Sequence, residues 1–164
     1  MTTIDMTASA SSELASTEIV VCTTCRPAGT PREQTAPGQL LYDAVQAALR
    51  PPSGARPSDG PAGHAADVAE AGATAPASVP RLKLRGLACM SGCDRACTVA
   101  LQAQGKFSYY FGDLRPDAET AAQLVACAQL HRDSGDGTLL RNARPERLRS
   151  GILARLPPVE PVAP

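Results

Sequence analysis

Residues 81–101 read RLKLRGLACMSGCDRACTVAL, and this stretch decides how the chain folds. From Arg81 to Leu87, leucine alternates with charged residues and one glycine at period two, which predicts a strand with one buried face. The strand leads directly into a loop that carries three cysteines, Cys89, Cys93 and Cys97. A strand that ends in a run of cysteines predicts a thiol-rich site at the edge of a sheet.

Downstream of this loop, the pattern predicts a hairpin followed by a helix. Residues 98–101 and 107–111 are short apolar and aromatic runs separated by a turn at 104–106. Residues 113–116 then open a helix, because proline is tolerated early in a helix and acidic residues favour its N-terminal end. The expected apolar stripe of this helix, which stops at Gly135, comprises Ala121, Leu124, Val125 and Ala128.

Upstream, residues 19–21 form a short β-branched run that predicts a first strand, and this strand ends in the sequence Cys22-Thr23-Thr24-Cys25. Residues 38–50 carry apolar side chains at helical spacing and are stopped by two prolines. The predicted order is therefore β-α-β-β-β-α. We interpret it as an α/β fold of the thioredoxin-like type, in a single domain spanning residues 19–158.

Composition sets the boundaries of this domain. Residues 1–18 are rich in Ser, Thr and Ala and are predicted to be a disordered lead, and residues 159–164 a short tail. Residues 51–80 consist mainly of Ala, Pro, Gly and Ser, which predicts a disordered insertion and makes His64 a solvated linker residue. Within the stretch 138–164, only residues 144–149 are expected to add a short helix.

The composition also limits the class of protein. The 16 basic and 16 acidic residues cancel, so no nucleic-acid or membrane surface is expected. No apolar run reaches the roughly 20 residues of a membrane span, and the N-terminus lacks a signal peptide pattern, so a cytoplasmic protein is expected. In a reducing cytosol, six cysteines are better explained as metal ligands or redox groups than as disulfides.

Topology predicts that the cysteines form one site. The two strands of a right-handed β-α-β unit are parallel, so their C-terminal ends emerge at the same sheet edge, which ligands prefer. This edge would bring together four thiols, and the predicted metal and cofactor ligands are therefore Cys22, Cys25, Cys89 and Cys93. A spacing of two residues between cysteines is typical of zinc and iron sites.

The remaining cysteines are harder to assign. Cys97 has three open roles: a fifth thiol that replaces a ligand, a redox group, or a packing residue. Cys127 lies beside the apolar stripe of the last helix and is interpreted as a packing residue, although His131 follows it at chelating distance along a helix. An iron–sulfur cluster on four thiolates is an anion, and three arginines close to the cysteines in sequence, Arg26, Arg85 and Arg95, are expected to offset its charge.

The two cysteine blocks, 22–25 and 89–101, resemble a bacterial family described as predicted metal-binding proteins related to thioredoxin-like [2Fe–2S] ferredoxins. The segments 105–114 and 144–158 are similar to that family as well, and the resemblance covers roughly residues 19–49 and 81–158. It implies a [2Fe–2S] cofactor and, because family members are often encoded near cobalamin-biosynthesis and cobalt-handling genes, a link to cobalamin metabolism.

Three functions stay open from the sequence. The first is an electron carrier with a [2Fe–2S] cluster, and the second is a module that binds or delivers zinc, iron or cobalt. The third is a dithiol oxidoreductase on Cys22 and Cys25, which ranks last because the first helix begins about a dozen residues after Cys25. A redox or metallochaperone protein is the expected partner, with a homodimer also open, and a carrier or binding protein is favoured over an enzyme.

Overall fold

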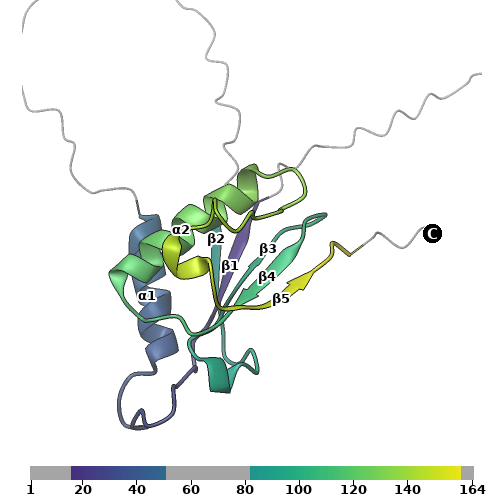
Figure 1. Ribbon diagram of the computed structural model, residues 1–164. Helices are drawn as coiled ribbons and strands as arrows, with labels where there is room; N and C mark the ends of the chain where they lie inside the picture. Colours follow the sequence, from purple (N-terminus) through teal and green to yellow (C-terminus); the bar gives the residue numbers. More distant parts are fainter. Residues whose placement is uncertain (1–15, 51–81, 160–164) are drawn as a thin grey trace, which may run out of the picture.

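The computed structural model describes residues 16–50 and 82–159, which form a mixed five-stranded sheet in the order β2-β1-β3-β4-β5. Both helices, α1 and α2, cover the same face of the sheet (Figure 1). In chain order the elements are β1 (Glu18–Cys22), α1 (Pro37–Leu49), β2 (Lys83–Leu87), the 3₁₀ turn η1 (Cys93–Arg95), β3 (Val99–Gln102), β4 (Ser108–Phe111), α2 (Ala118–Asp133), the 3₁₀ turn η2 (Glu146–Leu148) and β5 (Ile152–Leu156).

The central strand β1 organises the sheet. It pairs in parallel with β2, from Glu18 opposite Lys83 to Cys22 opposite Leu87, and antiparallel with β3 on its other side. Successive side chains of a strand point to opposite faces. One face of β1 therefore carries two fully buried residues that pack under the helices, Ile19 and Val21.

The core lies between this face and the helices. Val21 is opposite Val99 in the register of β1 and β3, and α1 and α2 cover the face with Leu41 and Leu124. Phe111 of β4 is also fully buried. Burial of such large aliphatic and aromatic side chains contributes roughly 1.5–3 kcal/mol each, so the helix-covered face is the main source of stability.

The predicted α/β order β-α-β-β-β-α is confirmed, with one addition. Residues 152–156 were expected to be irregular, but they form β5 and pair antiparallel with β4. The expected short helix at 144–149 is the turn η2, whose Leu148 is fully buried. Residues 152–156 alternate too weakly between apolar and polar side chains to predict a strand. They form a strand because the edge of β4 is free to pair with them.

The predicted boundaries are only partly described. Most of the expected lead, residues 1–15, and the whole expected insertion 51–80 with His64 lie outside the described residues, as do residues 160–164 of the tail. Within the described ranges, β1 begins at Glu18, inside the expected lead. Neither helix of these ranges combines the length and apolarity that a membrane crossing requires.

A buried polar cluster closes the C-terminal end of α2. The Nζ of Lys106 donates to the carbonyls of His131, Arg132 and Ser134 at 3.2, 2.6 and 2.6 Å. The imidazole of His131 lies 2.9 Å from the Thr17 hydroxyl and 2.7 Å from the Phe107 carbonyl. These contacts fix the tautomer, because Nε2 must donate to the carbonyl and Nδ1 must accept from Thr17.

This cluster predicts a pH-dependent stability. Burial lowers the pKa of His131 below its ordinary value of 6.5. The hydrogen bond to Phe107 raises this pKa in part, and the positive charge of Lys106 lowers it further. Below pH 6.5 the unfolded chain binds a proton at His131, whereas the folded chain keeps this imidazole neutral until the solution is more acidic. We expect the free energy of unfolding to fall by about 1 kcal/mol between roughly pH 7.5 and 5.5, and this slope to vanish in His131→Gln.

Urea denaturation at several pH values measures the slope. Asp117 and Asp136 do not interfere, because their pKa values are lowered to about 2 in the folded chain and their stabilising effect is lost only in more acidic solution. Equal slopes in the wild type and His131→Gln would show that His131 is not the responsible group.

Candidate thiol site

The two cysteine loops meet at the C-terminal ends of β1 and β2. Cys22 ends β1 directly opposite Leu87, which ends β2. The next residues hold the loops together, since the Thr23 N–H donates to the Leu87 carbonyl at 2.9 Å and the Thr24 hydroxyl donates to the Ala88 carbonyl. Figure 1 shows the loop after β1 and the loop that contains η1 at the same end of the sheet.

Cys22 and Cys25 form a buried pair at this end. Their exposed fractions are 3% and 2%. The first turn of α1 packs against them, because the Gly38 N–H donates to the Cys25 carbonyl at 3.1 Å. The Cα of Gly38 approaches so closely that a side chain there would collide with the backbone oxygen of Cys22 and the backbone nitrogen of Cys25.

This packing corrects one premise of the sequence analysis. The twelve residues between Cys25 and Gly38 were expected to keep the first helix away from the cysteines, but the intervening loop folds back. The side chain of Arg26 holds that loop closed by donating to the carbonyls of Pro31 and Gln34, both at 2.7 Å. Distance along the chain was therefore a poor guide to distance in space.

The two thiols of the pair differ in acidity. Burial works to raise the pKa of Cys22, but a hydrogen bond with Cys25 and the backbone N–H groups of Met90 and Thr24 outweigh it, so the pKa is lowered. Burial raises the pKa of Cys25, and its contact with Cys22 adds to the rise, although the Thr98 hydroxyl at 3.3 Å opposes it. Cys22 is therefore the more readily ionised thiol.

The second loop places its cysteines at the surface. Cys89 and Cys93 are both exposed, whereas Met90 and Gly92 between them are partly buried. The Ser91 N–H lies 3.4 Å from the Cys89 sulfur, in a turn where Ser91 has a φ of 57°. The Met90 carbonyl accepts a hydrogen bond of 2.8 Å from the Tyr110 hydroxyl, which ties this loop to β4.

Three of the predicted ligands lie within electrostatic range of one hydroxyl. Burial is the main cause that raises the pKa of Tyr110, and negative charge on Cys25, Cys22 and Cys89 raises it further. The charges that raise the pKa of Tyr110 therefore come from both cysteine loops. Cys93 lies four residues beyond Cys89, at the start of the exposed turn η1.

The other two cysteines are core residues. Burial raises the pKa of Cys97 to about 12, with a contribution from Cys25 and Cys22, and burial likewise raises the pKa of Cys127 to about 12. Both thiols are fully buried and protonated at neutral pH. His131, one turn after Cys127, binds Thr17 and Phe107 instead.

Within residues 16–50 and 82–159, no three Cys, His, Asp or Glu side chains are gathered closely enough to hold a metal ion as they stand. The expected arginines also have other partners. Arg85 pairs with Glu18 at 2.9 Å and Arg95 with Asp113 at 2.5 Å, so carboxylates already offset two of the three positive charges.

Comparison with protein families finds one match, to a family described as a protein of unknown function (DUF1636), over residues 65–158. The chain belongs to this family. Comparisons with curated proteins and with solved structures find no significant match. The DUF1636 match includes Cys89, Cys93 and Cys97 but not the segment 19–49, which the resemblance was expected to cover.

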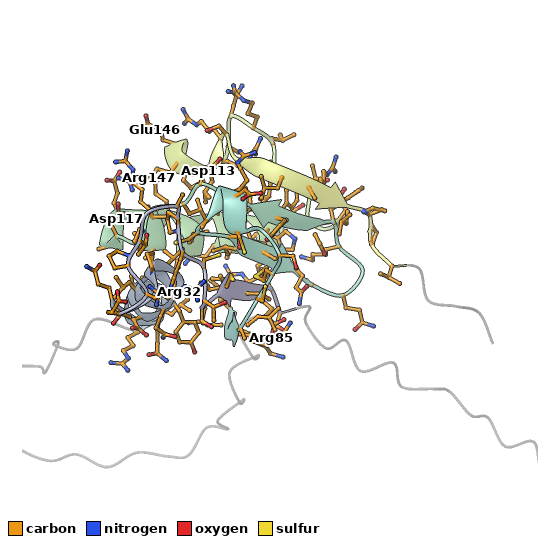
Figure 2. The ribbon with its side chains drawn as sticks, turned by 90° about the horizontal axis from the view of Figure 1, so that it is seen from below. Arg32, Arg85, Asp113, Asp117, Glu146 and Arg147 are labelled. Atoms are coloured by element: carbon orange, nitrogen blue, oxygen red, sulfur yellow. The ribbon has the colours of Figure 1, made fainter. Side chains whose placement is uncertain are left out.

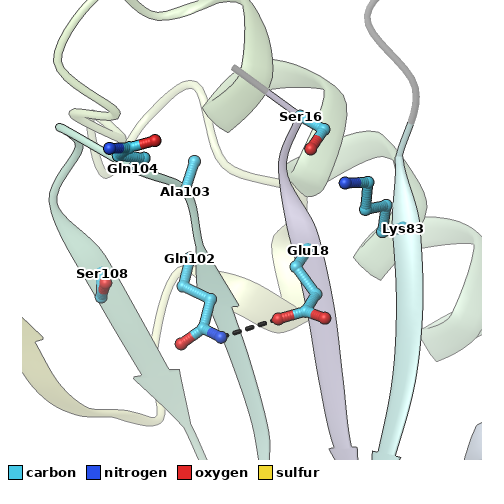
Figure 3. Close-up of a pocket in the computed structure, with 7 residues that line it drawn as sticks. All are labelled: Ser16, Glu18, Lys83, Gln102, Ala103, Gln104 and Ser108. Carbon is cyan, nitrogen blue, oxygen red and sulfur yellow. Dashed lines mark hydrogen bonds between the residues drawn. The ribbon is translucent and has the colours of Figure 1, made fainter. Parts of the chain in front are cut away.

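Two hollows of the DUF1636 chain lie away from the thiols. One, of about 350 Å³, opens on the sheet face without helices, beside the Glu18–Gln102 hydrogen bond and near Lys83 (Figure 3). Another, of about 320 Å³, lies near Arg147, which pairs with Asp117 at the start of α2 (Figure 2). No cysteine lines either hollow.

Thr98 and Tyr110 are polar residues of the thiol site that were not predicted from the sequence. A signal was available for Tyr110, since it alternates with two buried neighbours, Tyr109 and Phe111, and so must point to the opposite face of β4. Thr98 gave no such signal, because a threonine beside a strand of valine and leucine is ordinary.

The packing of α1 predicts that one methyl group added at Gly38 lowers the stability of the fold. Gly38→Ala should lower the free energy of unfolding by about 2 kcal/mol, because the new Cβ meets backbone atoms of Cys22 and Cys25 that cannot rotate aside. Gly135→Ala is the matched control, since nothing lies within 4 Å of the added carbon. Urea denaturation compares the two variants, and equal stability of both would contradict the contact.

Proposed function

We propose that the chain holds a thiophilic metal centre, with a [2Fe–2S] cluster as the leading candidate, and that it acts in electron transfer. The residues that would hold the centre are Cys22 and Cys25 from the loop after β1 and Cys89 and Cys93 from the loop after β2. The observation that carries the proposal is the direct contact of the two cysteine loops, in which Thr23 and Thr24 donate to the carbonyls of Leu87 and Ala88, just before Cys89. Cysteines are the ligands that such clusters require.

The backbone around the sulfur atoms supports this proposal. The N–H groups of Met90 and Thr24 stabilise negative charge on Cys22, and the Ser91 N–H points at Cys89. A metal centre binds thiolates and not thiols, so groups that favour the ionised form favour binding. When bound, a [2Fe–2S] cluster would supply one-electron redox chemistry, with N–H groups near its ligands tuning the potential.

The unequal burial of the two pairs gives them different tasks. Cys22 and Cys25 are held rigidly by β1, α1 and Thr98, so they would provide the fixed half of the centre. Cys89 and Cys93 are exposed and would complete it from the surface side, where an electron partner can approach. Closing the centre requires Cys89 and Cys93 to move closer to the buried pair, because the described residues do not gather three such side chains at metal-binding distance. An exposed loop can make such a local movement.

Metal analysis tests the proposal. Protein purified without oxygen should carry iron and acid-labile sulfide, with a visible chromophore that dithionite bleaches. Serine substitution at any of the four proposed ligands should abolish the chromophore, whereas Cys127→Ala, which removes a core thiol, should keep it. Colourless protein with stoichiometric zinc or cobalt would instead support the metal-binding or delivery role, and metal-free protein would reject both.

A second function, a dithiol oxidoreductase, is favoured by the contact between Cys22 and Cys25, whose pKa values shift in opposite directions. The Cys22 thiolate would attack a disulfide of a small oxidant such as glutathione disulfide and release one thiolate. Cys25 would then lose its proton, attack the Cys22 sulfur as a thiolate and release the second thiolate, leaving a Cys22–Cys25 disulfide. The two protons lost by Cys22 and Cys25 end on the two released thiolates.

Equilibration in glutathione redox buffers tests this second function. Mass spectrometry should detect the loss of two hydrogens confined to the peptide with Cys22 and Cys25, and Cys25→Ser should stop at a mixed disulfide on Cys22. Protein that stays fully reduced across the buffer series, although its thiols react after unfolding, would exclude this chemistry.

A further inference from the structure

Tyr110 lies between the two cysteine loops. Its hydroxyl donates to the Met90 carbonyl at 2.8 Å, so it holds the residue that follows Cys89. The N–H of the same Met90 stabilises Cys22 in the other loop. The Met90 peptide is therefore held by β4 on one side and contacts the first cysteine of the buried pair on the other.

Thr98 extends this connection to Cys25. Its hydroxyl lies 3.3 Å from the Cys25 sulfur, and its side chain is fully buried. The Thr98 methyl group and the Tyr110 hydroxyl both pack directly on Gly92, which lies between Cys89 and Cys93. Only a glycine fits there, because a Cβ would collide with both side chains.

Other anchors of the second loop lie at its two ends. At its N-terminal end the Thr24 hydroxyl donates to the Ala88 carbonyl, just before Cys89. Arg95 pairs with Asp113 at its C-terminal end, but both side chains are about half exposed, and exposed ion pairs stabilise little. The Asp113 N–H also donates to the Arg95 carbonyl at 2.7 Å, which fixes that end only. The central part of the loop depends on Tyr110, Thr98 and the close contact at Gly92.

We propose that Thr98 and Tyr110 are positioning residues that hold the two cysteine loops at a fixed separation and thereby set the metal affinity of the site. The consequence for affinity rests on the proposed function, whereas the positioning of the loop does not. β3 and β4 are hydrogen-bonded neighbours in the sheet, so the two side chains rise from one rigid support. Groups that orient metal ligands in this way typically change affinity by about 10- to 100-fold when removed.

Tyr110→Phe tests the proposal, with Tyr109→Phe as its matched control. Tyr109 is the neighbouring tyrosine on the opposite face, and its hydroxyl accepts a bond of 2.9 Å from the Leu139 N–H, away from the cysteines. Each variant thus loses one phenolic hydroxyl that bonds the backbone. Two quantities are measured: the affinity of the reduced protein for Co²⁺ alone, from the thiolate-to-cobalt absorption, and hydrogen exchange of amides 89–95 in the metal-free protein.

We expect Tyr110→Phe to bind Co²⁺ at least about 10-fold more weakly than Tyr109→Phe and to exchange amides 89–95 faster. Thr98→Val should weaken binding as well, and the double variant should lose less than the product of the two effects, because both act on one connection. Thr98→Val also serves as the test if Tyr110→Phe does not fold.

Equal affinity and equal exchange in Tyr110→Phe and Tyr109→Phe would overturn the proposal. If the wild type binds no Co²⁺, the metal function fails, and exchange alone then decides on the positioning role. Faster exchange confined to Tyr110→Phe supports that role, and unchanged exchange rejects it. If Co²⁺ binds and only the exchange of Tyr110→Phe changes, the loop is positioned but its separation does not set the affinity.

Discussion

The parallel pairing of β1 with β2 is the constraint on which the rest of the structure depends. It joins residues more than sixty positions apart in sequence and aligns Cys22 with Leu87. Because the strands run in the same direction, both cysteine loops leave from one end of the sheet. An antiparallel arrangement would have placed Cys22 and Cys89 at opposite ends.

The thiol site combines a buried pair and an exposed pair. Cys22 and Cys25 lie where β1, α1 and β3 meet. Their contact with each other and with surrounding polar groups shifts their pKa values in opposite directions. Cys89 and Cys93 belong to a loop whose centre is attached to β4 through Tyr110. In the proposed centre, Cys22 and Cys25 would form the side that faces the protein, and Cys89 and Cys93 the side that faces the solvent.

The family match and the geometry cover different parts of the site. The DUF1636 match includes the loop after β2 but begins beyond β1 and α1. The link between Cys22 and the matched region comes from the structure alone, through the register of β1 and β2 and the contacts of Met90 and Thr98. These contacts make β1 and the loop that follows it, residues 18–25, relevant to any activity of the matched part.

The sequence by itself determined the element order from β1 to α2, because period-two patterns, helical patterns and proline breaks are local features of the chain. It also determined the edge of the sheet where the cysteines lie, because the rule for parallel strands depends only on the order of the elements. The tertiary structure alone decided that residues 152–156 form β5, that α1 packs against Cys22 and Cys25, and that Thr98 and Tyr110 lie between the loops. Each of these depends on which surfaces are left free once the sheet has formed. A local pattern shows at most which face of a strand a side chain occupies, as it does for Tyr110, and not what it meets there.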